Sequence, residues 1–473
     1  MDRKLHFVTL GCPKNRVDSE IMLGHLARDG FEVAEDPENA DVLVVNTCGF
    51  IEDAKKESID VILDLARIKA GRPHAKLVVT GCLVQRYARE LAEEIPEVDV
   101  YLGNGAYDEI AAALDASSSQ TTVSVRPPNF LHSATQPRLN SFLPHSAYVK
   151  ISEGCDQRCS FCIIPQLRGT QRSRSIEDIR TEVQALAERG VVEVNLIAQD
   201  LTGYGYDQSP RVHLADLLQV LSSVEGLAWI RLHYLYPRHL PVRFFEMLAH
   251  PRIAPYVDMP LQHASDPILR RMNRGKGRDF VDRMLDRLRS ARPDAAIRTS
   301  FIVGFPGETE RDFQELCDFA RDQDFDHVGV FKYSHEEGTT SYDLDLQVPE
   351  ADKEARYAHL MAQLQEQSRA RLLRFQDRRL EVLVDGVSSE TELLLEARAP
   401  WQAPEVDGTI YINDGEARAG DRVEVEITET FDYDMVGHVT RMIQPAPPRP
   451  NHARLEARGA ARSRGAVRLP VLP

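Results

Sequence analysis

Three closely spaced cysteines stand in the stretch EGCDQRCSFC, which covers residues 153–162. Cys155, Cys159 and Cys162 follow a C-x3-C-x2-C pattern within one short loop. Iron–sulfur clusters are normally held by four thiolates, so three thiolates in one loop can bind three irons of a 4Fe–4S cube. Because no fourth cysteine lies nearby, one iron would keep an open coordination position. We therefore predict a reactive 4Fe–4S cluster at this loop.

Zinc and a disulfide are the alternatives for this loop. A structural zinc site needs a second pair of cysteine or histidine ligands, and the next histidine downstream, His213, stands alone. A disulfide is disfavoured because we expect the protein to be cytoplasmic. The loop resembles the signature of the radical S-adenosylmethionine (SAM) enzymes. In that superfamily the amino and carboxylate groups of SAM chelate the fourth iron.

A second set of three cysteines stands in the first hundred residues, each directly after an expected strand. They are Cys12 in TLGC, Cys48 in NTCG and Cys82 in TGC. The carboxyl ends of parallel strands share one edge of a sheet, where ligands bind. We therefore predict that these thiolates converge on a second 4Fe–4S cluster, and that adjacent glycines allow close approach. The alternative is three buried cysteines that serve only as small apolar side chains.

The elements that would position these cysteines follow from the apolar periodicity. Over residues 1–115 short apolar strands alternate with amphipathic helices, which predicts an open parallel α/β sheet. Strands are expected at 4–10, 40–46, 75–80 and 98–102, and helices at 19–29, 52–70 and 86–94. Residues 116–146 are rich in Ser, Thr, Pro and Asn and are predicted to be an interdomain linker, with a strand at 120–125 as the alternative.

Strands and helices alternate again in a second predicted domain at 147–375. Strands are expected at 147–151, 193–198, 229–233, 257–259, 297–303 and 327–332, and helices begin near 176, 214, 242, 266, 279 and 310. Six repeats predict a partial (β/α)6 barrel, whose functional face lies at the C-terminal ends of its strands. The second cysteine loop follows the first of these strands, at that face. The charged stretch 350–376 is predicted to be a solvated connecting helix.

Polar and glycine residues at the same face are candidate SAM ligands. Gln199 and Asp200 follow the second strand of the barrel, and the segment GFPGE at 304–308 follows the fifth. Gly304 would let the backbone approach adenine or the sulfonium, and Glu308 would bond a ribose. The alternative is a turn that caps the next helix. In the radical SAM superfamily the segment after the second strand contacts the SAM amino group, although Gln199 and Asp200 depart from its commoner Gly-Gly-Glu.

Residues 376–443 show apolar alternation along short strands separated by Gly and Asp, which predicts a small antiparallel β-barrel. This segment resembles a TRAM domain, a fold associated with RNA binding. It carries sixteen Asp or Glu against six Lys or Arg, the wrong sign for binding phosphates, so we expect a basic protein partner instead. Residues 444–473 hold many Pro and Arg and are predicted to form a disordered basic tail.

The composition is that of an ordinary multidomain globular protein. The chain has 473 residues, 42% of them hydrophobic and 27% charged, which is enough for about three domains. No run reaches the roughly 18 apolar residues that span a bilayer, and the N-terminus does not resemble a signal peptide, so we expect a cytoplasmic protein with no membrane partner. The net charge of -16 argues against broad affinity for nucleic acid. The seventh cysteine, Cys317, is expected to be buried in a core.

Two cysteine triplets followed by a TRAM-like barrel resemble the radical SAM methylthiotransferases over residues 4–443. The motifs TLGCPKN at 9–15, VNTCGFIEDAKKESID at 45–60 and GCDQRCSFCIIPQLRG at 154–169 are similar to the RimO branch, which modifies an aspartate of ribosomal protein S-twelve. The tRNA-modifying MiaB branch, one alternative, tends toward Gln-Met-Asn after the first cysteine. A non-enzymatic iron–sulfur redox protein is the other alternative, but it would need neither a barrel nor a SAM pocket.

The resemblance implies two 4Fe–4S clusters and SAM as cofactors, and methylthiolation of the β carbon of an aspartate. That carbon carries no leaving group and its C–H bond is barely acidic, so a radical rather than a general base must remove the hydrogen. By resemblance, the cluster at Cys155, Cys159 and Cys162 cleaves SAM. The cluster at the other three cysteines presents the sulfur. An external electron donor and a sulfur donor are the implied partners, beside the ribosomal protein.

Overall fold

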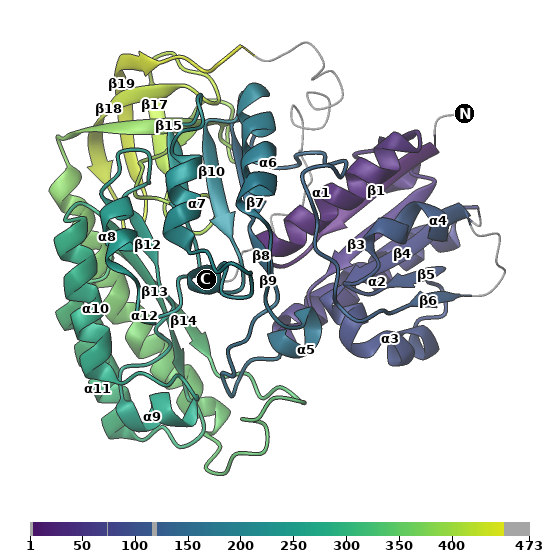
Figure 1. Ribbon diagram of the computed structural model, residues 1–473, viewed down its shortest axis with the longest axis horizontal. Coiled ribbons are helices and arrows are strands. Elements are labelled where there is room, and N and C mark those ends of the chain that lie inside the picture. The colour runs from purple at the N-terminus through teal and green to yellow at the C-terminus, as the bar shows by residue number, and fades with distance from the viewer. Residues whose placement is uncertain (1–2, 73, 116–120, 449–473) are drawn as a thin grey trace.

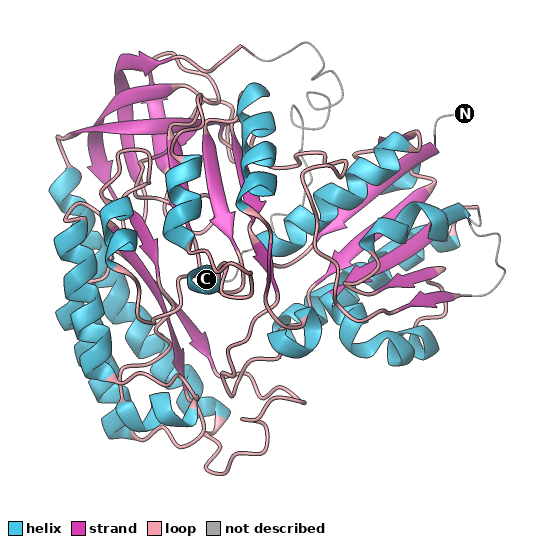
Figure 2. Cartoon of the chain, in the orientation of Figure 1, coloured by secondary structure: helices cyan, strands magenta, loops and turns pink. Residues whose placement is uncertain are grey.

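The computed structural model describes residues 3–72, 74–115 and 121–448, which form three parts (Figure 1). In Figure 1 an α/β sheet lies at the right, a partial barrel at the left, and a small β-barrel at the top left. Helices cover both faces of the first sheet and the outer side of the partial barrel (Figure 2). The part of the predicted basic tail from residue 449 onward lies outside the described residues.

The first sheet is parallel throughout, with the strand order β2-β1-β3-β4-β5-β6, and confirms the predicted α/β sheet. Its strands are β1 (Arg3–Thr9), β2 (Phe31–Val33), β3 (Val42–Thr47), β4 (Lys76–Gly81), β5 (Val100–Leu102) and β6 (Thr122–Ser124). Its helices are α1 (Pro13–Arg28), α2 (Glu52–Ala70), α3 (Cys82–Glu94) and α4 (Ile110–Asp115). Strand β2 is not foreseen by the sequence. Strand β6 falls in the predicted linker, where a strand is the alternative, and it pairs with β5.

The second part is the expected partial (β/α)6 barrel. Its parallel strands are β7 (Ser146–Lys150), β10 (Glu193–Ile197), β11 (Trp229–Leu232), β12 (Tyr256–Asp258), β13 (Ala296–Val303) and β14 (His327–Lys332). Its outer helices are α6 (Ile176–Glu188), α7 (Leu214–Leu221), α8 (Val242–Leu248), α9 (Asp266–Arg271), α10 (Arg278–Ala291) and α11 (Glu310–Gln323). The sheet is interrupted between β11 and β12, where a single bridge from Ile230 to Ile253 continues it. Cys317 is buried in the core between strands and helices, as expected.

Helix α12 (Glu350–Leu372) packs on the barrel and is not the solvated connector that its charge predicts. Leu360 and Leu364 are buried in the barrel core, one helical turn apart. Charged residues elsewhere on the helix hide this narrow apolar stripe in the sequence. Lys353 and Arg356 of the same helix reach the loop after β13.

The C-terminal barrel is closed, in the order β15-β16-β17-β19-β18. Its strands are β15 (Arg379–Val387), β16 (Leu395–Arg398), β17 (Ile410–Asp414), β18 (Arg422–Thr430) and β19 (Met435–Gln444). All pairings are antiparallel, as expected, except that β17 and β19 pair in parallel. Leu383 and Ala403 pack on Trp229 and Ala296, which begin β11 and β13. The small barrel therefore covers the N-terminal ends of the partial barrel's strands, opposite the expected functional face.

Helix α1 connects the first sheet to the partial barrel. One of its faces, with Met22, packs on the first sheet. Another face, with Val17 and Ile21, packs on Tyr148 of β7. Burial on both sides explains why apolar and polar residues alternate without a clear stripe in its sequence. The helix that begins after Cys12 is thus shared by the two parts and fixes one against the other.

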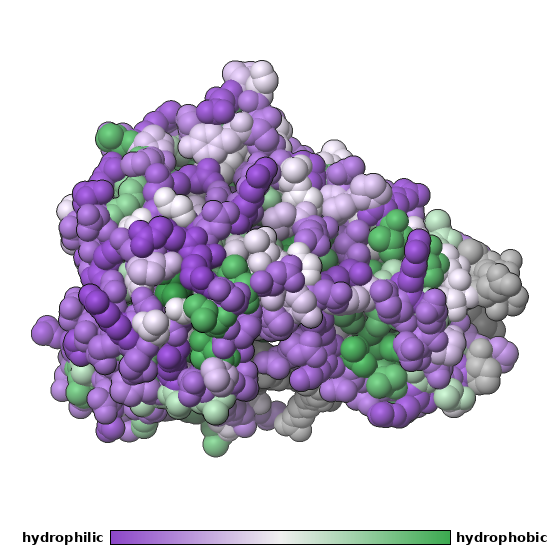
Figure 3. All heavy atoms as spheres, turned by 90° about the horizontal axis from the view of Figure 1, so that it is seen from below, coloured by the Kyte–Doolittle hydropathy of each residue, from purple (hydrophilic) through white to green (hydrophobic). Residues whose placement is uncertain are grey.

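Figure 3 shows the molecule from below, the side toward which the arrows of the barrel strands point in Figure 1. This face is mostly hydrophilic, with hydrophobic residues gathered in patches on both sides of a hollow between the first part and the barrel.

None of the helices within residues 3–72, 74–115 and 121–448 is long and apolar enough to cross a membrane.

Candidate active site between two cysteine triplets

The first triplet stands directly after β1, β3 and β4, where the sequence predicts it. Cys12 precedes α1, and Cys82 is the first residue of α3. The winding of the sheet reverses between β1 and β3, and doubly wound sheets bind ligands at such a switch point. Burial, together with the neighbouring thiols of Cys82 and Cys12, raises the pKa of Cys48 to about 12. The three thiols are therefore close enough to interact electrostatically.

Close packing and hydrogen bonds hold this triplet. A Cβ at Gly11, whose φ is +84°, would lie 3.1 Å from Sγ of Cys48, so only glycine leaves this sulfur free. Ser58 of α2 bonds both the N–H and the C=O of Cys48 at 3.0 Å. Asn104 donates to Sγ of Cys82 at 3.6 Å. Hydrogen bonds of this kind to ligand sulfurs tune the potential of an iron–sulfur cluster.

The second triplet lies in the loop between β8 (Ser152–Glu153) and α5 (Ile164–Arg168). Strand β8 pairs with β9 (Arg172–Ser173), which closes the loop at its base. Burial raises the pKa of Cys155 and of Cys162 to about 12 each, and the thiol of Cys159 contributes to both shifts. These thiols also interact with one another, as expected for ligands of one group.

Residues at the end of α9 and shortly after it hold the second cysteine loop in place. Ser160 donates from its hydroxyl to the carbonyl of Arg271 at 2.8 Å. Arg274 donates to Sγ of Cys159 at 3.5 Å, and its guanidinium lies 4.3 Å from the ring centroid of Tyr236. The guanidinium is thereby positioned beside the sulfur of a predicted cluster ligand, where positive charge favours the thiolate.

A buried ion-pair cluster joins the two triplets. It consists of Asp18 of α1, Lys150 of β7, Glu153 of β8 and Arg168 of α5. Arg168 donates to Asp18 at 2.6 Å and to Sγ of Cys82 at 3.3 Å. Burial alone would raise the pKa of Glu153, but Lys150 and Arg168 lower it to about 2, so this carboxylate is charged at neutral pH.

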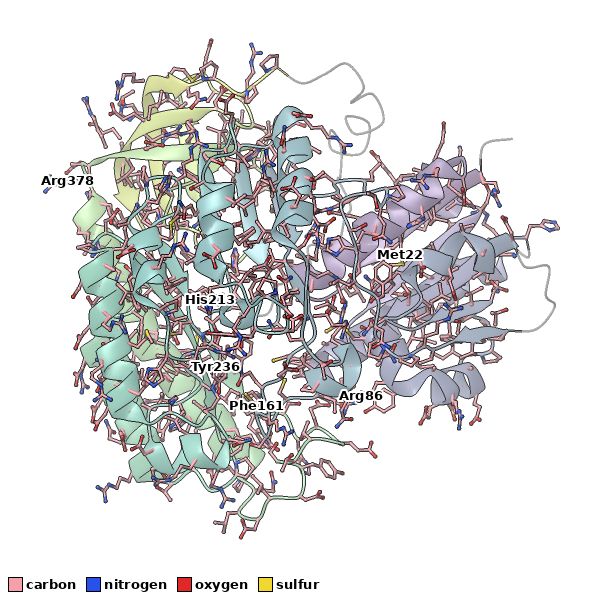
Figure 4. All side chains as sticks on the ribbon, in the orientation of Figure 1. Met22, Arg86, Phe161, His213, Tyr236 and Arg378 are labelled. Carbon is pink, nitrogen blue, oxygen red and sulfur yellow. The ribbon has the colours of Figure 1, made fainter. Side chains whose placement is uncertain are left out.

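A second contact joins the first part to the segment after β14. Glu336 is buried and pairs with Lys55 at 3.0 Å and with Arg86 at 2.9 Å. Arg86 also donates to the carbonyl of Gly49, directly after Cys48, at 3.1 Å. Figure 4 shows Arg86 and Tyr236 on opposite sides of Phe161, which lies in the second cysteine loop. Glu336 therefore connects the segment after β14 to α2 and α3 of the first part.

Gln199 and Asp200 follow β10 at the predicted face of the barrel. Gln199 donates to Glu153, and its Oε1 is buried without a hydrogen-bond partner among the residues that the structure describes. Asp200 accepts from Arg238 at 2.6 Å and from Gln157 at 3.0 Å. Side chains of the protein itself therefore already donate hydrogen bonds to the carboxylate of Asp200. Oε1 of Gln199, in contrast, can still accept a hydrogen bond from a ligand.

The GFPGE segment after β13 is a loop held by its own carboxylate. Glu308 accepts from the N–H of Gly304 at 2.8 Å and from that of Phe305 at 3.3 Å, and it pairs with Arg356 of α12 at 2.9 Å. Gly304 has a φ of +72°, and a Cβ there would lie 2.3 Å from Cγ of Lys353. In this structure Gly304 and Glu308, the two predicted SAM contacts, maintain the shape of the loop and its contact with α12.

Comparisons with known proteins agree with this geometry. Residues 4–103 match the model described as uncharacterized protein family UPF0004, residues 149–320 match the radical SAM superfamily, and residues 378–440 match the TRAM domain. The protein named ribosomal protein uS12 methylthiotransferase RimO from Anaeromyxobacter sp. (strain Fw109-5) is 54% identical, over 92% of this chain and 93% of that one. Its namesake from Myxococcus xanthus is 48% identical, over 99% and 98%. The chain belongs to the RimO family.

RimO membership confirms the predicted branch of the methylthiotransferases. Solved structures with a similar fold include the radical SAM methyltransferase TsrM from Kitasatospora setae, with a TM-score of 0.50 and 15% identity over 70% of this chain and 75% of that one. The cobalamin-dependent radical SAM enzyme OxsB has a TM-score of 0.51 and 13% identity over 76% and 55%. At such identities the likeness shows the fold alone.

The RimO family uses SAM and 4Fe–4S clusters, and the donors present here fit them. All seven cysteines are free, and six of them form the two triplets. Within the described residues no three His, Cys, Asp or Glu lie close enough to hold a single metal ion. Three free thiols in each triplet are the donors that a 4Fe–4S cluster with one open iron needs.

Sequence reasoning misses the charged residues between the triplets. They are Lys14, Lys150, Glu153, Arg168 and Arg274. Lys14 lies in the motif TLGCPKN, and Arg168 lies in the motif GCDQRCSFCIIPQLRG. A charged residue inside a motif that is expected to be packed was the signal that could have identified them. Arg274 carried no such signal, because it lies 112 positions after Cys162 in the sequence.

Proposed function

We propose that this enzyme methylthiolates the β carbon of an aspartate in ribosomal protein uS12, the small-subunit protein S-twelve. The name shared by relatives that are 46–54% identical to this chain, ribosomal protein uS12 methylthiotransferase RimO, supports this substrate. The observation that carries the proposal is the contact of Arg168, at the end of the helix α5 that follows the second cysteine loop, with Cys82 of the first triplet at 3.3 Å. It supports two neighbouring cluster sites, as a reaction needs when one site generates a radical and the other supplies sulfur.

In this proposal Cys155, Cys159 and Cys162 hold the SAM-binding cluster, and the triplet in the first part holds the other. With both clusters bound, SAM supplies a radical that removes hydrogen from the aspartate and a methyl group that joins the transferred sulfur. The protein's own contribution is to orient these groups and exclude water. Arg168 and Arg274 donate to ligand sulfurs, and α1 fixes the distance between the two sites.

The proposed SAM contacts lie at the ends of β10 and β13. The unpartnered Oε1 of Gln199 is a suitable acceptor for the SAM amino group, because a buried acceptor without a partner is unfavourable. Asp200 positions Arg238 and Gln157 beside this proposed SAM contact. Gly304 and Glu308 contribute through the loop that they shape, whose backbone can approach the adenine.

The reaction requires partners beyond the substrate. We place the enzyme in the cytoplasm, where ribosomal proteins are made and modified. The proposed partners are an external electron donor, which would supply electrons to the cluster held by Cys155, Cys159 and Cys162, and a sulfur donor, which would supply the sulfur that is transferred.

Mass spectrometry of an anaerobic reaction tests the function. The reconstituted enzyme, SAM and a reductant are offered uS12, free or in small ribosomal subunits, and bulk tRNA in parallel. A methylthio group on an aspartate of uS12 is the expected product. The same group on a tRNA adenosine, or on neither substrate while SAM is cleaved, would contradict the assignment.

Two cysteine variants test the division of labour. Cys159→Ala removes one ligand of the SAM-binding cluster, so we expect SAM cleavage to stop while the first triplet keeps its iron. Cys48→Ala should leave SAM cleavage intact and stop methylthio transfer. Each variant should lose about half of the bound iron. Loss of SAM cleavage in both variants would show that the two sites do not have separate roles.

A further inference from the structure

Lys14 is a cation without a carboxylate partner at the junction of the two cysteine sites. It lies in the first turn of α1, two residues after Cys12. Its Nζ is 3.4 Å from the ring centroid of Tyr234, which follows β11 at the functional face of the barrel. Within the described residues it forms no ion pair, since no Asp or Glu oxygen lies within 4.0 Å of Nζ.

The other cations between the two cysteine triplets already have partners, although those of Arg274 are not carboxylates but Sγ of Cys159 and the carbonyl of Pro260. Lys150 and Arg168 share Asp18 and Glu153. Arg16, half a turn farther along α1, pairs with Glu405 at 2.8 Å. A partly buried charge that no opposite charge balances is unfavourable, and proteins rarely keep one without a ligand. Lys14 is therefore the cation in this region that is available to an anion.

The acidic groups facing Lys14 are already used by other residues. Asp258, at the end of β12, accepts from the N–H of Tyr234 at 3.1 Å and pairs with Arg298 at 3.4 Å. Tyr234 has a left-handed φ of 62°, an unfavourable conformation for a tyrosine that places its ring under the ammonium. The aromatic face adds a favourable contact but supplies no countercharge.

We infer that Lys14 binds the side-chain carboxylate of the aspartate that the enzyme modifies. This inference rests on the proposed function. The carboxylate is attached directly to the carbon that reacts, so a cation that holds it also holds that carbon. Lys14 stands beside Cys12 of the sulfur-supplying site and reaches the strand ends of the barrel that holds the radical-generating site. A carboxylate bound there would lie between the two.

The inference makes Lys14 a determinant of substrate charge. A hydrogen-bonded ion pair in a partly buried site contributes more than a neutral hydrogen bond, so asparagine in place of the target aspartate should bind roughly 10-fold more weakly or worse. Lys14→Met keeps the length and the apolar stem of the side chain and removes only the charge. Lys14→Arg keeps the charge.

A binding cycle tests it with anaerobically reconstituted full-length enzyme. The wild type, Lys14→Met, Lys14→Arg and the exposed control Lys56→Met are titrated with uS12, in the form that the wild type modifies, and with uS12 whose target aspartate is changed to asparagine. We expect the wild type, Lys14→Arg and Lys56→Met to prefer the aspartate form by roughly 10-fold or more, and Lys14→Met to bind both forms equally. Equal iron content in all four would show that the clusters assemble in each variant.

Two results would overturn the inference while the proposed function stands. One is a wild type that modifies uS12 but binds the aspartate and asparagine forms equally. The other is Lys14→Met binding both forms more weakly by the same factor, which would indicate a structural role for Lys14 on Tyr234. A wild type that neither binds nor modifies uS12 would reject the proposed function and the inference together.

Discussion

Nη2 of Arg168 lies 3.3 Å from Sγ of Cys82, although Arg168 belongs to α5, the helix that follows the other cysteine triplet. The same guanidinium pairs with Asp18 of α1, and that carboxylate also binds Lys150 of the barrel. One side chain thus contacts a ligand of the first site, the helix that begins at that site, and the barrel. This buried cluster, together with the packing of α1 on β7, holds the two parts against each other.

Arg168→Met should separate the two sites and destabilise the fold. The substitution leaves Asp18 and Glu153 buried with only Lys150 between them, and loss of one partner from a buried ion-pair cluster costs about 3–5 kcal/mol. For a domain of this size that corresponds to a fall in Tm of about 5–10 °C. Anaerobic thermal unfolding measures it, and EPR of the first cluster should change because its sulfur loses a donor.

Arg180→Met is the matched control for Arg168→Met. Arg180 forms an exposed pair with Glu177 on the surface of α6, at 3.3 Å. Exposed pairs of this kind contribute about 0–1 kcal/mol, so its Tm should hardly change. Equal effects of the two substitutions would mean that the buried cluster does not hold the two parts together.

Gly304→Ala should destabilise the protein even when SAM is absent. The backbone is left-handed at φ +72°, and the new Cβ would lie 2.3 Å from Cγ of Lys353. Strain and overpacking together are expected to cost about 2–4 kcal/mol. Gly30→Ala is the control, because its φ is +83° but nothing lies within 4 Å of the new Cβ. If unfolding without SAM is unaffected by Gly304→Ala, the glycine serves the ligand rather than the contact with α12.

The sequence was sufficient for the features that repeat along the chain. Apolar alternation located the strands that precede Cys12, Cys48 and Cys82, and parallel strands bring their ends to one edge of a sheet. It was not sufficient for α12. The apolar pair Leu360 and Leu364 is too narrow to stand out among charged neighbours, and only the packed structure shows which face is covered.

Contacts between the parts were beyond the sequence for a different reason. Lys150 and Asp18 are separated by 132 residues, and a charged residue in isolation is equally compatible with solvent and with a buried pair. The small barrel covers the N-terminal ends of the strands, at the opposite end from the second cysteine loop. Only the structure shows that one of its acidic residues, Glu405, nevertheless pairs with Arg16 of α1.

His132 should make the protein less stable in mild acid. Burial and the charge of Arg174 lower its pKa to about 4, so it stays neutral in the fold and accepts a hydrogen bond from Arg174 at 2.8 Å. An unfolded histidine titrates near 6.5. Between these values the unfolded chain binds a proton that the folded chain does not, so stability falls as the pH is lowered from about 6.5 to 4, by roughly 3 kcal/mol in total.

His132→Gln keeps an acceptor for Arg174 and removes the titration. The wild type should therefore lose more in Tm between pH 7 and pH 5 than this variant does, whereas the exposed control His74→Gln should follow the wild type. If the Tm of the wild type and that of His132→Gln fall by the same amount between pH 7 and pH 5, the acid sensitivity has another origin.

Glu336 should control how firmly the first part docks on the barrel. Burial alone would raise its pKa, but Ser334, Lys55 and Arg86 keep it below its usual value, so it is ionised at neutral pH. Glu336→Gln leaves Arg86 buried without a countercharge, whereas Lys55 keeps Glu52 at 2.7 Å. We expect the docking to weaken by about 2–4 kcal/mol.

The expected signature of Glu336→Gln is faster hydrogen exchange in α2 and α3, where Lys55 and Arg86 lie. Methylthio transfer should fall because Arg86 also holds the loop at Gly49, next to Cys48. SAM cleavage should continue because Cys159 and Ser160 of the second cysteine loop are bonded by Arg274 and Arg271 of the barrel. Glu337→Gln is the matched control, since Glu337 is exposed and contributes only its backbone carbonyl to Arg86. If SAM cleavage falls as much as methylthio transfer, or if both variants behave alike, then the docking contact is not what couples the two sites.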